Sequence, residues 1–389
     1  MITQYLNKIF PKKQERKSSN GFFISEDFLK SNNITASEYA NNVIVYRCVN
    51  IISQAASHIP WVVIDKSSGR QVKLTQHPIY EILKRPNHLQ AGAEFFSELV
   101  ASKLLYGNSY ILGQGEKIIS SLHLLHPNNM EFVQQNGVQP HYVYKNNGKE
   151  IKFPINSKTN KSQILHIKNY NPNSATKGLS CLKPASRAIE LHNSTSDWNN
   201  SLLKNGARPT GALVMKDSGQ YLSDDQFERL QEQLYDKFSG SNNAGKPLLL
   251  EGGLDWRDMS INPKDMDYIE SKNAASREIA LAFGLPPQLL GISGDNTYSN
   301  MQEARLALWE ETIIPLLDKL SDSLSAWLSS WHNKDIIIDF DRDAISAISE
   351  KRQNTWEKIS NANFMTINEK RSFVGLPPIK NGDLISYEK

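Results

Sequence analysis

The chain has 389 residues, of which 39% are hydrophobic and 22% are charged, and its formal net charge is +3. At the usual ~100–200 residues per domain, this length predicts two or three structural regions. The small net charge gives no reason to expect a surface that wraps nucleic acid. No stretch approaches the ~20 consecutive apolar residues of a membrane span. We therefore expect a protein of cytosolic origin that does not enter a membrane.

Cysteine and histidine usage argues against metal chemistry. Cys48 and Cys181 are too few for a zinc cluster or a disulfide framework. Each lies in a helical apolar pattern, which predicts burial as a small hydrophobic side chain. The nine histidines show no paired ligand spacing. We expect neither a metal site nor a cofactor.

The first segment, residues 1–38, is predicted to be a flexible N-terminal arm. Its part from 12 to 21 is charged and poor in large apolar residues, as in segments that cannot build a core. An arm that binds nucleic acid is the alternative interpretation.

Residues 39–178 combine helix and strand patterns. A helical stripe of apolar residues ends at Pro60 and is followed by the strand-like run 61–64. The stripe consists of Val45, Val49, Ile52, Ala56 and Ile59. The dipeptides Asn136-Gly137 and Asn147-Gly148 are typical of β-hairpin turns. This region is predicted to be α+β with antiparallel pairing.

Helix patterns dominate from residue 179. Residues 179–205 and 263–285 each read as one helix, and the second is rich in small residues. Between them, residues 206–262 are predicted to form a small α/β insertion, with strands at 210–215, 247–250 and 254–261 around a helix capped by Ser223.

A sharp helix stop precedes a polar loop. Phe283-Gly284-Leu285-Pro286-Pro287 supplies a C-terminal glycine and then two prolines, which lack the N–H needed to continue the helix. The loop is predicted to span residues 286–300, where Ser299 and Gln302 have the spacing of a capping box.

The predicted element at 301–341 is a long helix, kinked at Pro315, followed by a strand at 336–340 that returns to the first sheet. Its apolar seam is predicted to pack in the core. The seam consists of Ile313, Leu317, Leu320, Leu324, Trp327 and Trp331. Residues 342–389 read as a helical cap.

Two catalytic motifs occur without their context. Gly240 to Lys246 has P-loop spacing, but Pro247 replaces the Ser/Thr that binds metal, and a strand follows where a helix is needed. Ser180-Cys181-Leu182-Lys183 matches the Ser-x-x-Lys nucleophile motif, but its partner motifs are missing. We interpret the first as a loop and the second as a helix start, so no catalytic residue is predicted.

The order of these passages resembles the portal proteins of tailed bacteriophages, the head–tail connectors of the lambdoid, long-tailed phage type. The resemblance covers about Val45 to Asp383. Its central block is Arg277-Glu278-Ile279-Ala280, Phe283 to Pro287, Leu290-Gly291 and Thr297 to Asn300. A C-terminal block is Thr366 to Arg371, Gly375-Leu376-Pro377-Pro378 and Gly382-Asp383. Upstream, Asn205 to Pro209 and Leu250 to Leu254 also fit. Lys370 stands where the family pattern has a small residue.

The resemblance implies a name and a role for each region. Residues 39–178 would form the wing, 179–205 and 263–285 the stem helices, 206–262 the clip, 286–300 the tunnel loop, 301–341 a kinked helix with a wing strand, and 342–389 the crown. Such a protein forms a ring, typically of twelve subunits, at one vertex of the virion capsid. Double-stranded DNA is packaged and ejected through it, without sequence preference and without catalysis by the ring.

Two sets of residues are the predicted DNA-channel positions. The tunnel-loop set is Asp295, Asn296, Thr297, Tyr298, Ser299 and Asn300. The stem set is Lys264, Asp267, Glu270, Lys272 and Arg277, which mixes both signs of charge. The alternative for the loop is a connection that touches nothing. The expected partners are the terminase large subunit, the major capsid protein or scaffold, and a head–tail adaptor, first met in the host cytoplasm.

Two other functions stay open from the residues alone. One is a nucleotide-driven packaging ATPase that uses the loop from Gly240 to Lys246. The other is a monomeric assembly adaptor with an α/β insertion. Nucleotide binding distinguishes the first from a portal ring, and particle mass distinguishes the second.

Overall fold

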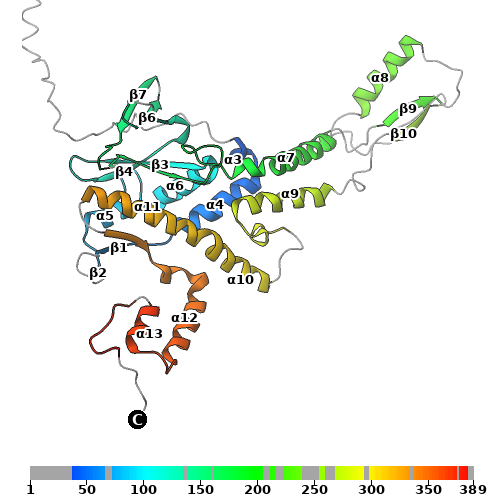
Figure 1. Cartoon of the computed structure of the whole chain (residues 1–389). Coiled ribbons are helices and arrows are strands. Elements are labelled where there is room, and N and C mark those ends of the chain that lie inside the picture. The colour runs from blue at the N-terminus through cyan, green and yellow to red at the C-terminus, as the bar shows by residue number, and fades with distance from the viewer. Residues whose placement is uncertain are drawn as a thin grey trace, which may run out of the picture. The chain divides into compact units, whose positions relative to one another are not determined.

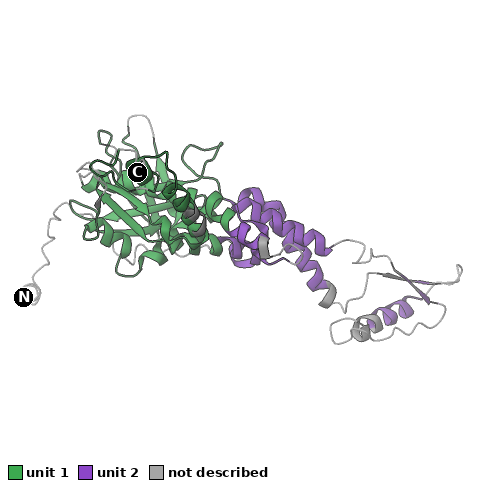
Figure 2. Cartoon of the chain, turned by 90° about the horizontal axis from the view of Figure 1, so that it is seen from below, with its two compact units in different colours: residues 1–34, 50–180, 306–389 green, residues 35–49, 181–305 purple. Residues whose placement is uncertain are grey.

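The computed structural model describes residues 37–65, 72–134, 138–146, 148–159, 161–204, 211–215, 223–238, 254–258, 268–292, 298–332, 336–374 and 376–383. They divide into two compact units (Figure 2). Unit 1 takes its described residues from 50–180 and 306–389, and unit 2 takes them from 35–49 and 181–305. Helices and strands are mixed throughout, so the predicted α+β class is confirmed.

The first sheet of unit 1 has three strands, in the order β11-β1-β2 (Figure 1). β1 (Trp61–Asp65) is central, and it pairs antiparallel with β11 (Ile336–Phe340) and with β2 (Val72–Lys73). Trp61 lies opposite Phe340, and Val63 lies opposite Ile338. The predicted return of the strand at 336–340 is therefore confirmed.

A second three-stranded sheet has the order β4-β3-β8. Its strands are β3 (Asn108–Gln114), β4 (Ser121–Leu125) and β8 (Ile164–Lys168), and they pair antiparallel. Every residue of β3 is buried, because this central strand also packs against α6 (Gly92–Tyr106). The short helix α5 (Pro78–Lys84) precedes α6 in the chain.

The third sheet consists of β5 (Met130–Val133), β6 (His141–Asn146) and β7 (Lys149–Pro154), and it follows the 3-10 turn η1 (Pro127–Asn129). Both strand pairs are antiparallel, as the two Asn-Gly signals predicted. A buried cluster joins the second and third sheets. It contains Tyr110, Leu112, Leu125, Met130, Tyr144, Phe153 and Ile164.

The predicted long helix is interrupted one turn before its proline. α10 (Tyr298–Ala307) leads into the π-helical segment η5 (Leu308–Ile313), and α11 (Ile314–His332) follows. A π-helical segment, which is a wider helical turn, thus lies just ahead of Pro315, where the kink is predicted. Most of the seam is buried, including Leu317, Leu320 and Leu324, and α11 packs against β11. The prediction of a core seam is confirmed.

The C-terminal part of unit 1 contains the turn η6 (Arg342–Ala344), α12 (Ser346–Ser360) and α13 (Ile367–Phe373). In unit 2, α3 (Ser37–Asn41) precedes α4 (Val43–Ser57), whose residues from Asn50 onward belong to unit 1. The predicted stripe on α4 is buried. Within the part of the chain that the structure describes, no helix is both long and apolar enough to cross a membrane.

The remaining elements of unit 2 follow α7 (Leu182–Lys204). β9 (Gly211–Met215) pairs antiparallel with β10 (Leu254–Asp258), and α8 (Asp224–Phe238) lies between them in the chain. α9 (Tyr268–Phe283) and the 3-10 turn η4 (Pro287–Leu290) come next. The strand predicted at 247–250 lies outside the described residues.

Candidate functional site

The candidate site is built on α7 and α9, which pack against each other within unit 2. Most of the buried side chains on the two helices are small or medium-sized, which lets helix backbones approach closely. The buried residues are Ala185, Ala188, Ile189, His192 and Thr195 on α7 and Ala275, Ser276, Ile279, Ala280 and Phe283 on α9. Toward the other end of the pair, Trp198 stacks on Tyr268, with ring centroids 4.3 Å apart and planes at 13°.

A buried asparagine joins α4 to α7. The Oδ1 atom of Asn42 accepts hydrogen bonds from the backbone N–H groups of Ile44 (3.0 Å) and Val45 (3.1 Å), so it caps the start of α4. Its Nδ2 donates to Oδ1 of Asn193 at 2.8 Å and lies 3.3 Å from Nδ1 of His192. This side chain therefore fixes the start of α4 on the middle of α7.

His192 is buried in this contact. Burial lowers the pKa of its imidazole, and the positive charge of Lys272 lowers it further. Lys272, a predicted stem residue on α9, therefore acts electrostatically on α7. Its own side chain is half-buried.

The end of α9 confirms the predicted stop. Gly284 adopts φ +72°, a left-handed conformation that suits glycine. Its N–H donates to the Leu281 carbonyl (3.0 Å), and the Leu285 N–H donates to the Ala280 carbonyl (2.9 Å), the two bonds of a Schellman motif. Leu285 is buried, so it anchors the chain where the loop begins.

The structure describes only part of the predicted tunnel-loop set. Asp295, Asn296 and Thr297 lie outside the described residues. Tyr298, Ser299 and Asn300 form the first turn of α10, and Asn300 is exposed. The helix therefore starts before Ser299, and the prediction that Ser299 is its N-cap is wrong.

The structure also describes only part of the predicted stem set. Lys264 and Asp267 lie outside the described residues. On α9, Glu270 is exposed, whereas Lys272 and Arg277 are half-buried. Two large apolar side chains that the sequence reasoning missed, Ile269 and Leu281, are 76% and 67% exposed on the same helix.

No group of three or more His, Cys, Asp or Glu side chains in the described part of the chain could hold a metal ion. Cys48 is buried as predicted, but Cys181 is only partly buried. The P-loop-like segment from Gly240 to Lys246 lies outside the described residues.

A sequence profile described as phage portal protein matches residues 43–375. The chain belongs to the phage portal protein family. In sequence it is 23% identical over 356 residues to the portal protein of Enterobacteria phage HK97, a match that covers 87% of this chain and 80% of that protein.

Solved structures of gene transfer agent (GTA) particles contain similar chains. One chain, in the neck of an empty particle computed with C6 symmetry, is 36% identical with a TM-score of 0.69; the match covers 92% of this chain and 96% of that chain. Another, in the neck of a native particle computed with C12 symmetry, is 34% identical with a TM-score of 0.66, covering 93% and 97%.

Membership confirms the resemblance that the sequence blocks indicated. The family match includes the central block around Gly284 and ends at residue 375, within the C-terminal block. A hydrogen bond within the chain connects the two ends of this block: the Asn368 N–H donates to the Gly382 carbonyl at 2.8 Å.

Proposed function

We propose that the chain assembles into a ring of twelve subunits at one vertex of a phage or phage-like capsid, and that double-stranded DNA passes through the ring during packaging and ejection. The observation that carries this proposal is the similarity to chains in GTA necks, at 36% identity over 92% of the chain. The C6 and C12 symmetries of those necks support a closed ring with twelve positions.

Exposed apolar side chains on α9 support the assembly of copies. Ile269 and Leu281 are large and mostly exposed in the single chain. Leu281 lies on the same face of the helix as the exposed Ala274 and Glu278, whereas Ile269 is exposed in the first turn of α9. Burial of such side chains against a second copy is favourable by about 1.5–3 kcal/mol for each fully buried residue.

The two stem helices suit the wall of a channel. α7 has 23 residues, a length of about 34 Å at the usual rise per residue. On α9, Glu270, Arg277 and Glu278 mix both signs of charge along an exposed or half-buried face. A mixed lining avoids the strong, salt-dependent attraction to phosphates that a uniformly basic wall would give.

In this proposal the ring is a conduit and not an enzyme. The terminase large subunit supplies the motor, the major capsid protein or a scaffold surrounds the ring, and a head–tail adaptor binds it later. Residues 295–300 and the stem set lie along the DNA path. The ring is assembled in the host cytoplasm and becomes part of the portal vertex of the virion.

Particle mass, with images of the same sample, tests the ring. The full-length chain is expected to form rings with a central hole wide enough for a DNA duplex. Leu281→Glu and Ile269→Glu place charges at two exposed positions of α9 and are expected to reduce the ring fraction at least tenfold. Leu89→Glu is the control, because Leu89 is equally exposed (62%) but lies in unit 1. A chain that stays monomeric on concentration, and with its capsid partners, would support the adaptor alternative.

DNA retention tests the tunnel loop separately. Deletion of Asp295 and Asn296 is expected to leave rings intact and to reduce the DNA retained in filled particles. Unchanged packaging and retention in assembled rings would contradict the proposed contact between loop and DNA. Nucleotide binding by the purified ring would instead favour the ATPase alternative.

A further inference from the structure

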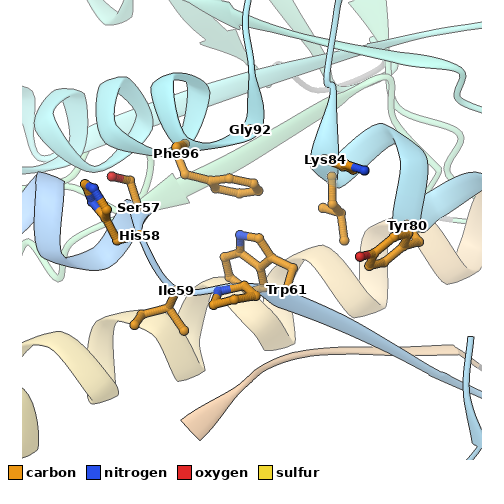
Figure 3. Close-up of a pocket in the computed structure, with 11 residues that line it drawn as sticks. Ser57, His58, Ile59, Trp61, Tyr80, Lys84, Gly92 and Phe96 are labelled. Carbon is orange, nitrogen blue, oxygen red and sulfur yellow. The ribbon is translucent and has the colours of Figure 1, made fainter. Parts of the chain in front are cut away.

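Unit 1 contains a pocket of about 220 Å³ that is separate from the stem and the loop. Three neighbouring segments line it: the link from α4 to β1, the end of α5 and the start of α6. Figure 3 shows their side chains around one open space. The sequence analysis predicted a strand at Trp61 but no pocket beside it.

The walls are largely aromatic. Trp61 and Phe96 face each other with ring centroids 4.8 Å apart, and Tyr80 stands across the space from them (Figure 3). Aromatic walls of this kind accept an apolar side chain of a ligand.

An indole N–H group in the wall lacks a partner. Trp61 is 8% exposed, and its Nε1 atom has no hydrogen-bond acceptor among the described residues. The nitrogen lies on the edge of the ring that faces Phe96 (Figure 3), where protein atoms cover it. An aromatic ring is a weak acceptor at best, and buried donors are rarely left unpaired in native proteins. The unpaired donor indicates that a ligand supplies the acceptor.

The basic side chains that line the pocket favour a ligand with a negative charge. Among the described residues, the lining includes the basic side chain of Lys84 and the imidazole of His58, but no carboxylate. Glu81 and Glu94 lie on the same two helices outside the lining. An anionic group therefore complements this pocket better than a cationic one.

The loop between α5 and α6 is preorganised. Asn87 accepts hydrogen bonds from the backbone N–H groups of Leu89 and Gln90, both at 2.9 Å, and its Nδ2 donates to the Leu122 carbonyl at 2.9 Å. These bonds hold the two helices that form the pocket wall, which lowers the entropy cost of binding.

We propose that this pocket binds a peptide segment of a partner protein that carries an apolar side chain next to a carboxylate. The apolar side chain lies against Trp61, Tyr80 and Phe96, the carboxylate pairs with Lys84, and a carbonyl oxygen of the segment accepts the Trp61 hydrogen bond. Because Nε1 is covered in the free chain, neighbouring side chains shift as the segment enters, as is common on binding. This function goes beyond the channel and does not depend on it.

A peptide array tests the proposal with the full-length chain. Each spot carries a pentapeptide with one residue pair between Gly-Ser flanks, and further spots carry overlapping pentapeptides of this chain. We expect retention on spots that join Leu, Met or Phe to Asp or Glu. Replacement of the acid by its amide should weaken binding about tenfold, as expected for one lost charge pair.

Variants connect the binding to the pocket. Trp61→Phe keeps an aromatic side chain, although a smaller one, and removes the donor; it should weaken binding about tenfold. Lys84→Gln should abolish the preference for acids but keep the preference for apolar residues. Lys158→Gln changes an exposed lysine elsewhere in unit 1 and should have no effect.

Three outcomes would overturn the proposal. One is no retention above the Gly-Ser background, and another is unchanged affinity in folded Trp61→Phe. The third is strongest binding to a segment of this chain, which would make the occupant a second copy. If Trp61→Phe fails to fold, the Lys84→Gln variant still tests the proposal. The Lys84 side chain is exposed, so its replacement leaves the core intact.

Discussion

His166 shows how one half-buried side chain makes unit 1 sensitive to acid. Its ring stacks on Tyr110 with centroids 4.2 Å apart, and its Nε2 lies 2.9 Å from Oδ1 of Asn108. That oxygen also accepts the Gly178 N–H at 2.7 Å. Burial, and secondarily the charge of Lys168, lowers the pKa of His166 to about 4. The imidazole is therefore neutral in the fold at pH values where it is charged in the unfolded chain.

Acidification from about pH 6.5 to about pH 4 is expected to destabilise unit 1 through His166. The unfolded state binds the proton first, so up to about 3 kcal/mol of stability is lost as pH falls through this window. His166→Phe keeps the stacked ring and removes the titration. Its thermal unfolding midpoint should lie below that of the natural chain at pH 7.5, and the gap should close at pH 4.5. A gap that stays constant would contradict the assignment, because the other histidines titrate in both proteins.

The two cysteines should differ in reactivity. Burial raises the pKa of the Cys48 thiol to about 12, whereas Cys181 is partly exposed. Since the thiolate is the nucleophile, Cys48 is expected to be inert at pH 8. With a disulfide reagent, the folded Cys181→Ala chain should react at less than a tenth of the rate of the folded Cys48→Ala chain. Comparable rates would show that the packing that buries Cys48 on α4 opens readily.

At the scale of elements, a single asparagine organises the C-terminal block. Asn368 on α13 accepts the Ile379 N–H at 2.8 Å, and its Nδ2 donates to the Ile379 carbonyl at 3.1 Å and to Asp383 Oδ1 at 2.9 Å. Gly382 lies so close that a Cβ atom there would be 2.3 Å from Oδ1 of Asn368. The spacing of these residues in the sequence block thus reflects one hydrogen-bonded turn.

Asn368→Ala is expected to release residues 376–383 from α13. The lost side-chain bonds correspond to about 1–3 kcal/mol of local stability, because the freed backbone groups return to water. Limited proteolysis should cut this segment at least five times faster than in the natural chain. Gln353→Ala, on the exposed face of α12, is the control and should leave the rate unchanged. Equal rates in all three proteins would contradict the role of Asn368.

Local patterns in the sequence predicted most elements, because each depended on neighbouring residues alone. The stripe on α4, the hairpin turns and the stop at Gly284 are of this kind. The start of α10 was mispredicted because the spacing of Ser299 and Gln302 matches a cap without forming one. The π-helical segment before Pro315 depends on packing of the whole helix, which no local pattern reveals.

Long-range polar contacts at the candidate site could not be predicted in the same way. Asn42 reaches His192 and Asn193 across 150 residues of chain, so its role depends on the tertiary fold. Likewise, Trp61 has the pattern of a buried strand residue, and only its surroundings show that its N–H lacks an acceptor. The exposure of Ile269 is also invisible to periodicity, since Ile269 falls on the side of α9 that carries the buried Ser276 and Ala280.

At the scale of the whole molecule, a small net charge is compatible with passage of DNA. The chain carries 44 basic and 41 acidic side chains, excluding histidine. In a ring of identical chains, the ratio of basic to acidic side chains stays the same. The electrostatic attraction between the ring surface and a polyanion such as DNA is therefore weak. We therefore expect weak, sequence-independent binding of duplex DNA to the assembled ring, with a shallow dependence on salt.

Charge reversal on α9 tests whether that helix faces the DNA. Glu270→Lys combined with Glu278→Lys raises the net charge of the chain by four units on an exposed face. Each of the two reversals contributes two units. If the face lines the channel, DNA affinity should rise, and the slope of log affinity against log salt should steepen by about 0.9 per new phosphate contact. Packaging should slow, because DNA held by the wall slides less freely. Glu94→Lys, exposed on α6 in unit 1, should change neither the slope nor the packaging rate. If the α9 double variant behaves like Glu94→Lys in intact rings, α9 does not line the DNA path, and the channel wall must be formed by other residues.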